Sequence, residues 1–154
     1  MIRSRLVAIT AVAVFLPAAA SADKVDPRLA TVRKVFITAA NDAGDDQGVA
    51  TCLADRLASP FEVVKTKEEA DAVLVVKAHV PSSTSRVLLG AMGGTPSATV
   101  EAQLPDGKTL WSDGAKFRRG NGAIGLGRDV QCGLAGGLAD ALRDAARKAR
   151  DAKK

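Results

Sequence analysis

Residues 72–80 read AVLVVKAHV, and this run of β-branched and other apolar side chains predicts the central strand of a sheet. Successive side chains of a strand point to opposite faces, so Leu74 and Val76 belong to one wholly apolar face. The opposite face ends in Lys77 and His79 and therefore becomes polar along its length. We expect one face of the sheet to pack against the core and the other to be partly exposed to water.

A β-hairpin is predicted further along the chain. Residues 98–104 (ATVEAQL) alternate strictly between apolar and polar side chains, as half-buried strands do. Residues 105–108 (PDGK) have the composition of a tight turn. Residues 109–117 then return as the partner strand, which carries the chain's single tryptophan, Trp111.

Two shorter strands are predicted upstream, at residues 33–39 (RKVFITA) and 61–65 (FEVVK). Between them, residues 49–58 space their apolar side chains as an amphipathic helix does. Asp45 or Asp46 precedes that helix, where a carboxylate can cap free backbone N–H groups and favour the positive helix end.

The remaining helical segments follow the second strand and the hairpin. Residues 66–69 (TKEE) have the form of a capping box, which predicts one helical turn. A long helix is predicted from about Arg128 to the end of the chain, because apolar residues recur there at every fourth position. That stripe consists of Val130, Leu134, Leu138 and Leu142.

Together these segments predict an α+β fold in the order β-α-β-α-β-β-β-α, built on a single mixed sheet of about five strands. Because one sheet face is expected to be partly exposed, the two main helices should pack mainly on the other face. We expect a single domain over residues 32–154, preceded by a flexible leader at residues 23–31.

The first 22 residues have the features of a secretory signal peptide. Arg3 and Arg5 give a positive start, an apolar run follows to Leu16, and the small residues up to Ala22 form a cleavage pattern. The run is shorter than the ~20 apolar residues that span a bilayer, and we expect no transmembrane segment elsewhere. We therefore predict cleavage after Ala22 and a periplasmic or secreted protein. The new first residue, Asp23, offers no cysteine for a lipid anchor.

The charge of the chain argues against a nucleic-acid-binding protein. The leader holds two of the 22 basic residues and none of the 17 acidic ones, so the mature chain carries about +3. Nucleic-acid binders usually carry a denser basic patch, and export would separate the protein from nucleic acid. Weak contact with anionic lipid headgroups or wall polymers remains compatible with this charge.

Two cysteines remain after cleavage, Cys52 and Cys132. An even number in an oxidising compartment predicts one disulfide bond. Two helices on one sheet face would also bring Cys52 beside the helix start that carries Cys132. The alternative is a pair of buried free thiols, which pack as small apolar side chains.

No catalytic set, metal site or cofactor site is predicted. Residues 120–125 (GNGAIG) match a dinucleotide-binding pattern, but no parallel strand follows the next helix, so a connecting loop is the simpler interpretation. The single histidine, His79, has no second histidine or Cys-x-x-Cys motif to complete a metal site. Candidates for contact with an anion flank the glycine-rich loop, namely Arg118, Arg119 and Arg128.

Residues 81–96 form a long connection, and connections of this length often bind partners or are partly disordered. The alternative is that they extend the neighbouring strands into a longer hairpin. If the connection binds a partner, the candidate contact residues are Arg86, Leu88, Leu89 and Met92.

The order of elements, residues 70–76 (ADAVLVV) and the hairpin at residues 104–112 (LPDGKTLWS) resemble a group of small bacterial envelope domains. This group includes the amino-terminal domain of the Tol-Pal translocation protein, the penicillin-binding-protein activator lipoproteins and the curli-secretion channel family. The resemblance covers roughly residues 32–146 and implies a mixed sheet with helices that docks other proteins. This chain differs from the lipoprotein members in lacking an acylated cysteine.

The function that these features favour is a non-enzymatic, exported domain that docks another envelope protein or a cell-wall component. One alternative is a small envelope hydrolase or transferase that uses His79 or residues 82–85 (SSTS). Another is a module that binds anionic lipid or polymer through the arginines named above and the basic C-terminal tail.

Overall fold

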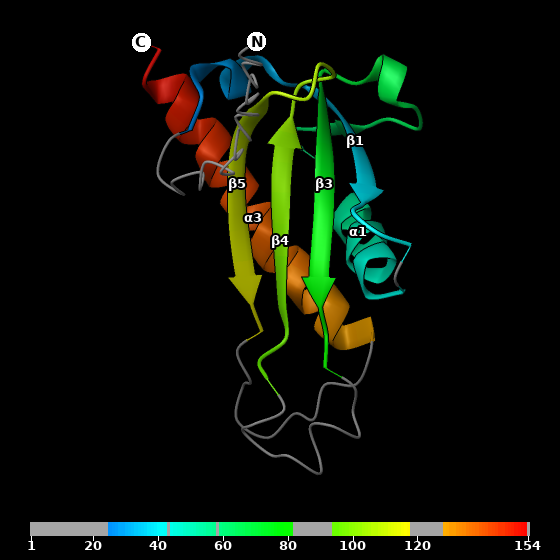
Figure 1. Cartoon of the computed structure of the whole chain (residues 1–154). Helices are drawn as coiled ribbons and strands as arrows, with labels where there is room; N and C mark the ends of the chain where they lie inside the picture. Colours follow the sequence, from blue (N-terminus) through cyan, green and yellow to red (C-terminus); the bar gives the residue numbers. More distant parts are fainter. Residues whose placement is uncertain (1–24, 43, 58, 82–93, 118–127, 154) are drawn as a thin grey trace, which may run out of the picture.

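The structure of the chain is a computed structural model that describes residues 25–153 except positions 43, 58, 82–93 and 118–127 (Figure 1). A one-turn 3₁₀ helix comes first, strands and helices follow, and a long helix ends the chain. The described elements are η1 (Pro27–Thr31), β1 (Lys34–Ala39), α1 (Gly44–Arg56), β2 (Glu62–Val63), η2 (Lys67–Glu69), β3 (Ala72–His79), β4 (Ser97–Gln103), β5 (Thr109–Lys116) and α3 (Arg128–Asp151).

Within the described ranges, five strands form one sheet in the order β2-β1-β3-β4-β5. β1 runs parallel to both β2 and β3, whereas β3, β4 and β5 are antiparallel neighbours. In the turn between β4 and β5, Gly107 adopts a φ of 88°, and the Leu104 N–H donates to the Lys108 carbonyl at 2.8 Å. The predicted α+β class, the mixed sheet and the hairpin are therefore confirmed.

Both long helices lie on the same face of the sheet, as predicted, and contact each other there (Figure 1). The core lies between these helices and the strands, where Leu53 of α1, Leu138 of α3 and Val76 of β3 are completely buried. The apolar stripe predicted for the last helix is also buried, from Val130 to Leu142. Among the described helices, none is both long and apolar enough to span a bilayer.

Residues 27–31, within the predicted leader, form η1 and contact α3. Asp26 caps this turn by accepting a hydrogen bond from the Arg28 N–H at 2.9 Å. The Asp26 N–H donates to the Leu110 carbonyl at 3.0 Å, and Leu29 is 1% exposed. Burial of Leu29 and the link to β5 offset the entropy cost of ordering this segment.

Three local boundaries also differ from the predictions. α1 begins at Gly44 rather than at residue 49. Its first turn carries Asp45 and Asp46, which favour the positive end of a helix but lack the apolar spacing from which the start at residue 49 was predicted. The turn predicted at residues 66–69 forms as η2, but the Thr66 side chain makes no capping hydrogen bond. β2 has only two residues, because the chain leaves β1 after the Val64 N–H donates to the Val35 carbonyl at 2.9 Å.

Candidate functional site

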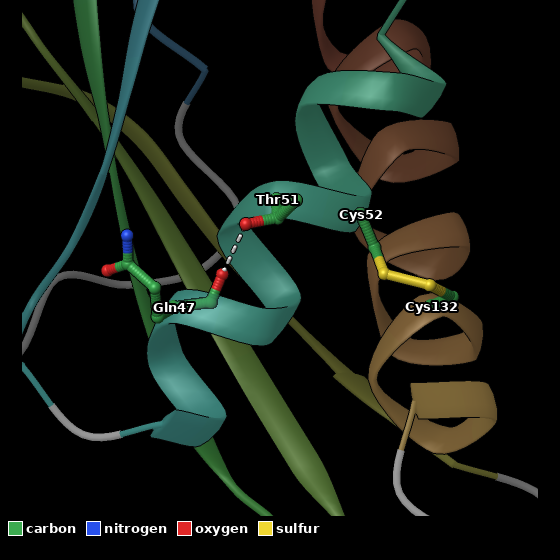
Figure 2. The surroundings of a disulfide bond; sticks show 4 residues. All are labelled: Gln47, Thr51, Cys52 and Cys132. Carbon is green, nitrogen blue, oxygen red and sulfur yellow. Dashed lines mark hydrogen bonds between the residues drawn. A yellow bond between two sulfur atoms is a disulfide. The ribbon is translucent and has the colours of Figure 1, made fainter.

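A disulfide bond joins α1 to α3 on the helix-covered face of the sheet (Figure 2). It links Cys52 and Cys132, whose Cα atoms are 5.0 Å apart and which are separated by 80 positions in the chain. Cys52 is 4% exposed and Cys132 is partly buried. The predicted bond is therefore confirmed, and the alternative of two free thiols is not.

The two helices approach closely beside this bond because Gly48 has no side chain. A Cβ atom at that position would lie 2.1 Å from Oε1 of Gln131. The same glutamine donates a hydrogen bond from Nε2 to Oδ1 of Asp45 at 3.3 Å. The disulfide therefore belongs to a packed interface between the helices rather than to an isolated surface link.

Most of the predicted partner and anion contacts lie outside the described residues, so they stay predictions. This applies to Arg86, Leu88, Leu89 and Met92 and to Arg118 and Arg119. Arg128 is the first residue of α3. Residues 82–85, named for a possible hydrolase, also lie outside the described ranges.

The sheet face opposite the helices is not covered by any described helix, and Figure 1 looks onto it. Two neighbouring rows of residues cross this face where β3 ends, which we call the basic rows. Lys77, His79, Thr99 and Lys116 within them are exposed. Strand pairing places Lys77 beside Thr99 and Gly114 in one row, and His79 beside Ser97 and Lys116 in the next.

The same face is more apolar further from the basic rows. Phe36 and Val75 are half-buried there, and Val73 is buried. Glu101 lies one row from Lys77 on this face and accepts a hydrogen bond from the Thr109 hydroxyl. The uncovered face therefore combines an apolar part with a positively charged end.

Asp46 is the one charged side chain that is buried among the described residues, with 1% of its surface exposed. Its Oδ1 accepts a hydrogen bond from the Ala78 N–H at 2.6 Å, and its Oδ2 accepts from the backbone and side-chain nitrogens of Asn41 at 3.1 and 3.0 Å. The predicted capping role is therefore wrong for Asp46, because its carboxylate ties the start of α1 to the end of β3. The sequence carries no local pattern that identifies this contact.

A hollow of about 390 Å³ lies beside β1, α1 and β2, at the edge of the sheet that is opposite to β5. It is present because β2 reaches only as far as Val63, which leaves the end of β1 without a described neighbour on that side. Gln47 and Thr51 line it from α1, and the Thr51 hydroxyl donates to the Gln47 carbonyl at 2.9 Å (Figure 2). None of the described residues that line it is titratable.

Two carboxylates elsewhere have lowered pKa values, and both serve the fold. Hydrogen bonds from the backbone of Lys34 and Arg33 lower the pKa of Asp71, which joins the start of β1 to the start of β3. The Arg28 side chain lowers the pKa of Asp26 to about 2. Within the described ranges, no three His, Cys, Asp or Glu side chains are grouped so that they could hold a metal ion.

No protein-family model and no curated protein matches this chain. The chain is similar in fold to the PelC dodecamer from Paraburkholderia phytofirmans, with 16% identity, coverage of 71% of this chain and 86% of that one, and a TM-score of 0.46. A variant PelC dodecamer from the same organism has 17% identity, coverage of 79% and 93%, and a TM-score of 0.47. Uncharacterized lipoprotein B from Nitrosomonas europaea has 14% identity, coverage of 79% and 82%, and a TM-score of 0.32.

No family model links the chain to the three families that its sequence resembles. Likeness at these identities and TM-scores does not extend to function or assembly.

Proposed function

We propose that this chain is exported and works as a non-enzymatic domain that docks another protein or a cell-wall component in the bacterial envelope. The Cys52–Cys132 bond is the observation that carries the exported part of the proposal. Disulfides form and persist in oxidising compartments such as the bacterial periplasm and are rare in the cytosol. The signal-peptide features of residues 1–22 supply a route to that compartment.

The docking role is supported by the arrangement of the layers. Both long helices pack on one face of the sheet (Figure 1). The opposite face presents exposed side chains on β3, β4 and β5. Strand pairing fixes the backbone positions of these residues relative to one another, so a partner that binds there has little backbone to order.

In-cell photo-crosslinking tests the docking role. A photoreactive residue is placed at Thr99 on the uncovered face and, separately, at Leu88 and Met92 in the long connection. A matched control carries it at Asp140 on α3, whose side chain is 80% exposed. We expect a discrete adduct from at least one of the three test positions and none from Asp140. No adduct from any test position would overturn the docking role.

Export is tested separately by the intact mass of the protein recovered from the periplasmic fraction. We expect a chain that begins at Asp23 and gains two hydrogens on reduction. An uncut chain retained in the cytoplasm would overturn the proposed compartment.

A further inference from the structure

We propose that the uncovered sheet face binds an acidic protein surface, with the basic rows facing carboxylates of that partner. This proposal rests on the docking role above and specifies the chemistry of the partner. The basic side chains that carry it are Lys77, His79 and Lys116, which strand pairing places in two neighbouring rows.

The strand register brings these three residues together from different parts of the chain. His79 pairs with Ser97, and Ser97 pairs with Lys116, so one row crosses three strands. Lys77 lies two positions before His79 and therefore on the same face, ~7 Å away along the strand. His79 and Lys116 are separated by two strand spacings, or ~10 Å. Lys77 and Lys116 are two strand spacings and one row apart, or ~12 Å, which is more than the Debye length at physiological salt, so a partner meets them as two separate charges.

No described carboxylate forms a salt bridge with the lysines of the basic rows. Lys77 and Lys116 make no salt bridge with any residue in the described part of the chain. Glu101 is a diagonal neighbour of Lys77, but its carboxylate accepts the Thr109 hydroxyl on the side away from Lys77. Asp46 lies near the end of β3, but it is buried and its oxygens accept three hydrogen bonds. Both lysines are therefore exposed and without an ion pair within the described ranges, so a partner's carboxylates can reach them.

The rest of the face favours a protein partner over a lipid headgroup or a wall polymer. One row from Lys77 lies the half-buried Val75 with Thr38 beside it, and the half-buried Phe36 lies one row further away. A protein surface can place apolar side chains against these residues and carboxylates against the lysines in one contact. A hydrophilic polyanion can use the lysines but gains nothing from Val75 and Phe36.

A peptide titration followed by NMR tests the proposal on the mature, disulfide-bonded protein. The probe is a short soluble peptide of alternating glutamate and valine, and the neutral comparison peptide replaces each glutamate with glutamine. We expect the glutamate peptide to shift the amide signals of Lys77, His79, Thr99 and Lys116 most strongly, and its binding to weaken as salt is raised. The glutamine peptide should bind at least ~tenfold more weakly.

Charge-reversal variants locate the site. Lys77→Glu combined with Lys116→Glu should weaken binding of the glutamate peptide by ~tenfold or more. The matched control, Lys148→Glu with Lys153→Glu, makes the same change in net charge at exposed positions near the C-terminus. It should change affinity less than ~twofold. The neutral pair Lys77→Gln and Lys116→Gln gives a second test if the reversed pair folds poorly.

Several results would overturn the proposal. These are equal loss of binding in the test and control pairs, equal binding of the two peptides, or no binding of the glutamate peptide. Binding only to phosphatidylglycerol vesicles or to polygalacturonate would assign the face to a lipid or a polymer instead. If Thr99 still gives a discrete adduct in cells after any of these results, the docking role stands and only the partner chemistry is wrong.

Discussion

Removing the disulfide should cost this protein a large share of its stability. The perturbation is the double variant Cys52→Ala with Cys132→Ala, which deletes the bond between α1 and α3. The bond closes a loop with a sequence separation of 80, and the chain-entropy relation gives about 4–5 kcal/mol for such a loop. Domains of this size usually unfold with about 5–15 kcal/mol, so the loss would be a large share of the total.

The assay is thermal unfolding of the mature protein followed by circular dichroism. With an unfolding entropy of ~2.1 cal/mol/K per residue, a loss of about 4–5 kcal/mol lowers Tm by roughly 15 °C. Reduced wild-type protein should melt near the double variant, because it lacks the same covalent link but keeps both sulfur atoms. Reductant should leave the Tm of the double variant unchanged.

A small effect would refute this reasoning. If the double variant melted within ~3 °C of oxidised wild type, loop closure would not be a main source of stability. The packing of Gly48 against Gln131 and the apolar contacts between the helices would then be sufficient to hold α1 on α3.

Three further predictions concern the contacts that hold the helices and strands together. Asp46→Asn should lower the unfolding free energy in urea by about 1–3 kcal/mol, because an amide nitrogen would then face an N–H donor inside the protein. Asp45→Asn is the matched control and should change it by less than about 0.5 kcal/mol. Gly137→Val should lower Tm more than Gly136→Val. A Cβ at position 137 would lie 3.1 Å from the Cβ of Ala115, whereas one at position 136 would meet the flexible Arg56 side chain. Equal losses of Tm would contradict close packing of α3 on β5. The pKa of Asp71 is lowered in the folded protein, so its stabilising effect is complete above the ordinary aspartate pKa and is lost as pH falls through the lowered pKa. The urea concentration at the unfolding midpoint should therefore fall less between neutral and acidic pH in Asp71→Asn than in wild type.

The parts of the fold that could be predicted from the sequence are those encoded by local periodicity. The buried stripe of α3 repeats every fourth residue, and the alternation of residues 98–104 assigns Val100 to the core and Thr99 to the exposed face. The disulfide could be predicted because both helices were expected on one face of the sheet. Each of these inferences needs only the repeat of an element and the rule that its apolar side is buried.

The parts that could not be predicted depend on partners that are distant in the chain. Asp46 binds the backbone of Ala78, which lies 32 positions away, and no spacing within α1 marks it as different from Asp45. In β5, both Leu110 and Trp111 are buried although they are consecutive, because the pairing shifts register opposite Ala102 and Gln103. The basic rows are formed by the register of three strands, so Lys116 could not be grouped with Lys77 before the pairing was known.

The links that hold α1 also bear on the uncovered face. α1 is fixed to α3 by the bond from Cys52 and to β3 by Asp46, which binds the Ala78 N–H between Lys77 and His79. The end of β3 is therefore fixed by α1 from the helix-covered side of the sheet, although β1 no longer pairs with β3 beyond Val76. A cation held in this way loses less backbone freedom on binding than one in a loop, so more of its interaction with a carboxylate would appear as affinity. In this arrangement, Asp46 and the Cys52–Cys132 bond on the helix-covered side of the sheet help to position Lys77 and His79 on the uncovered face.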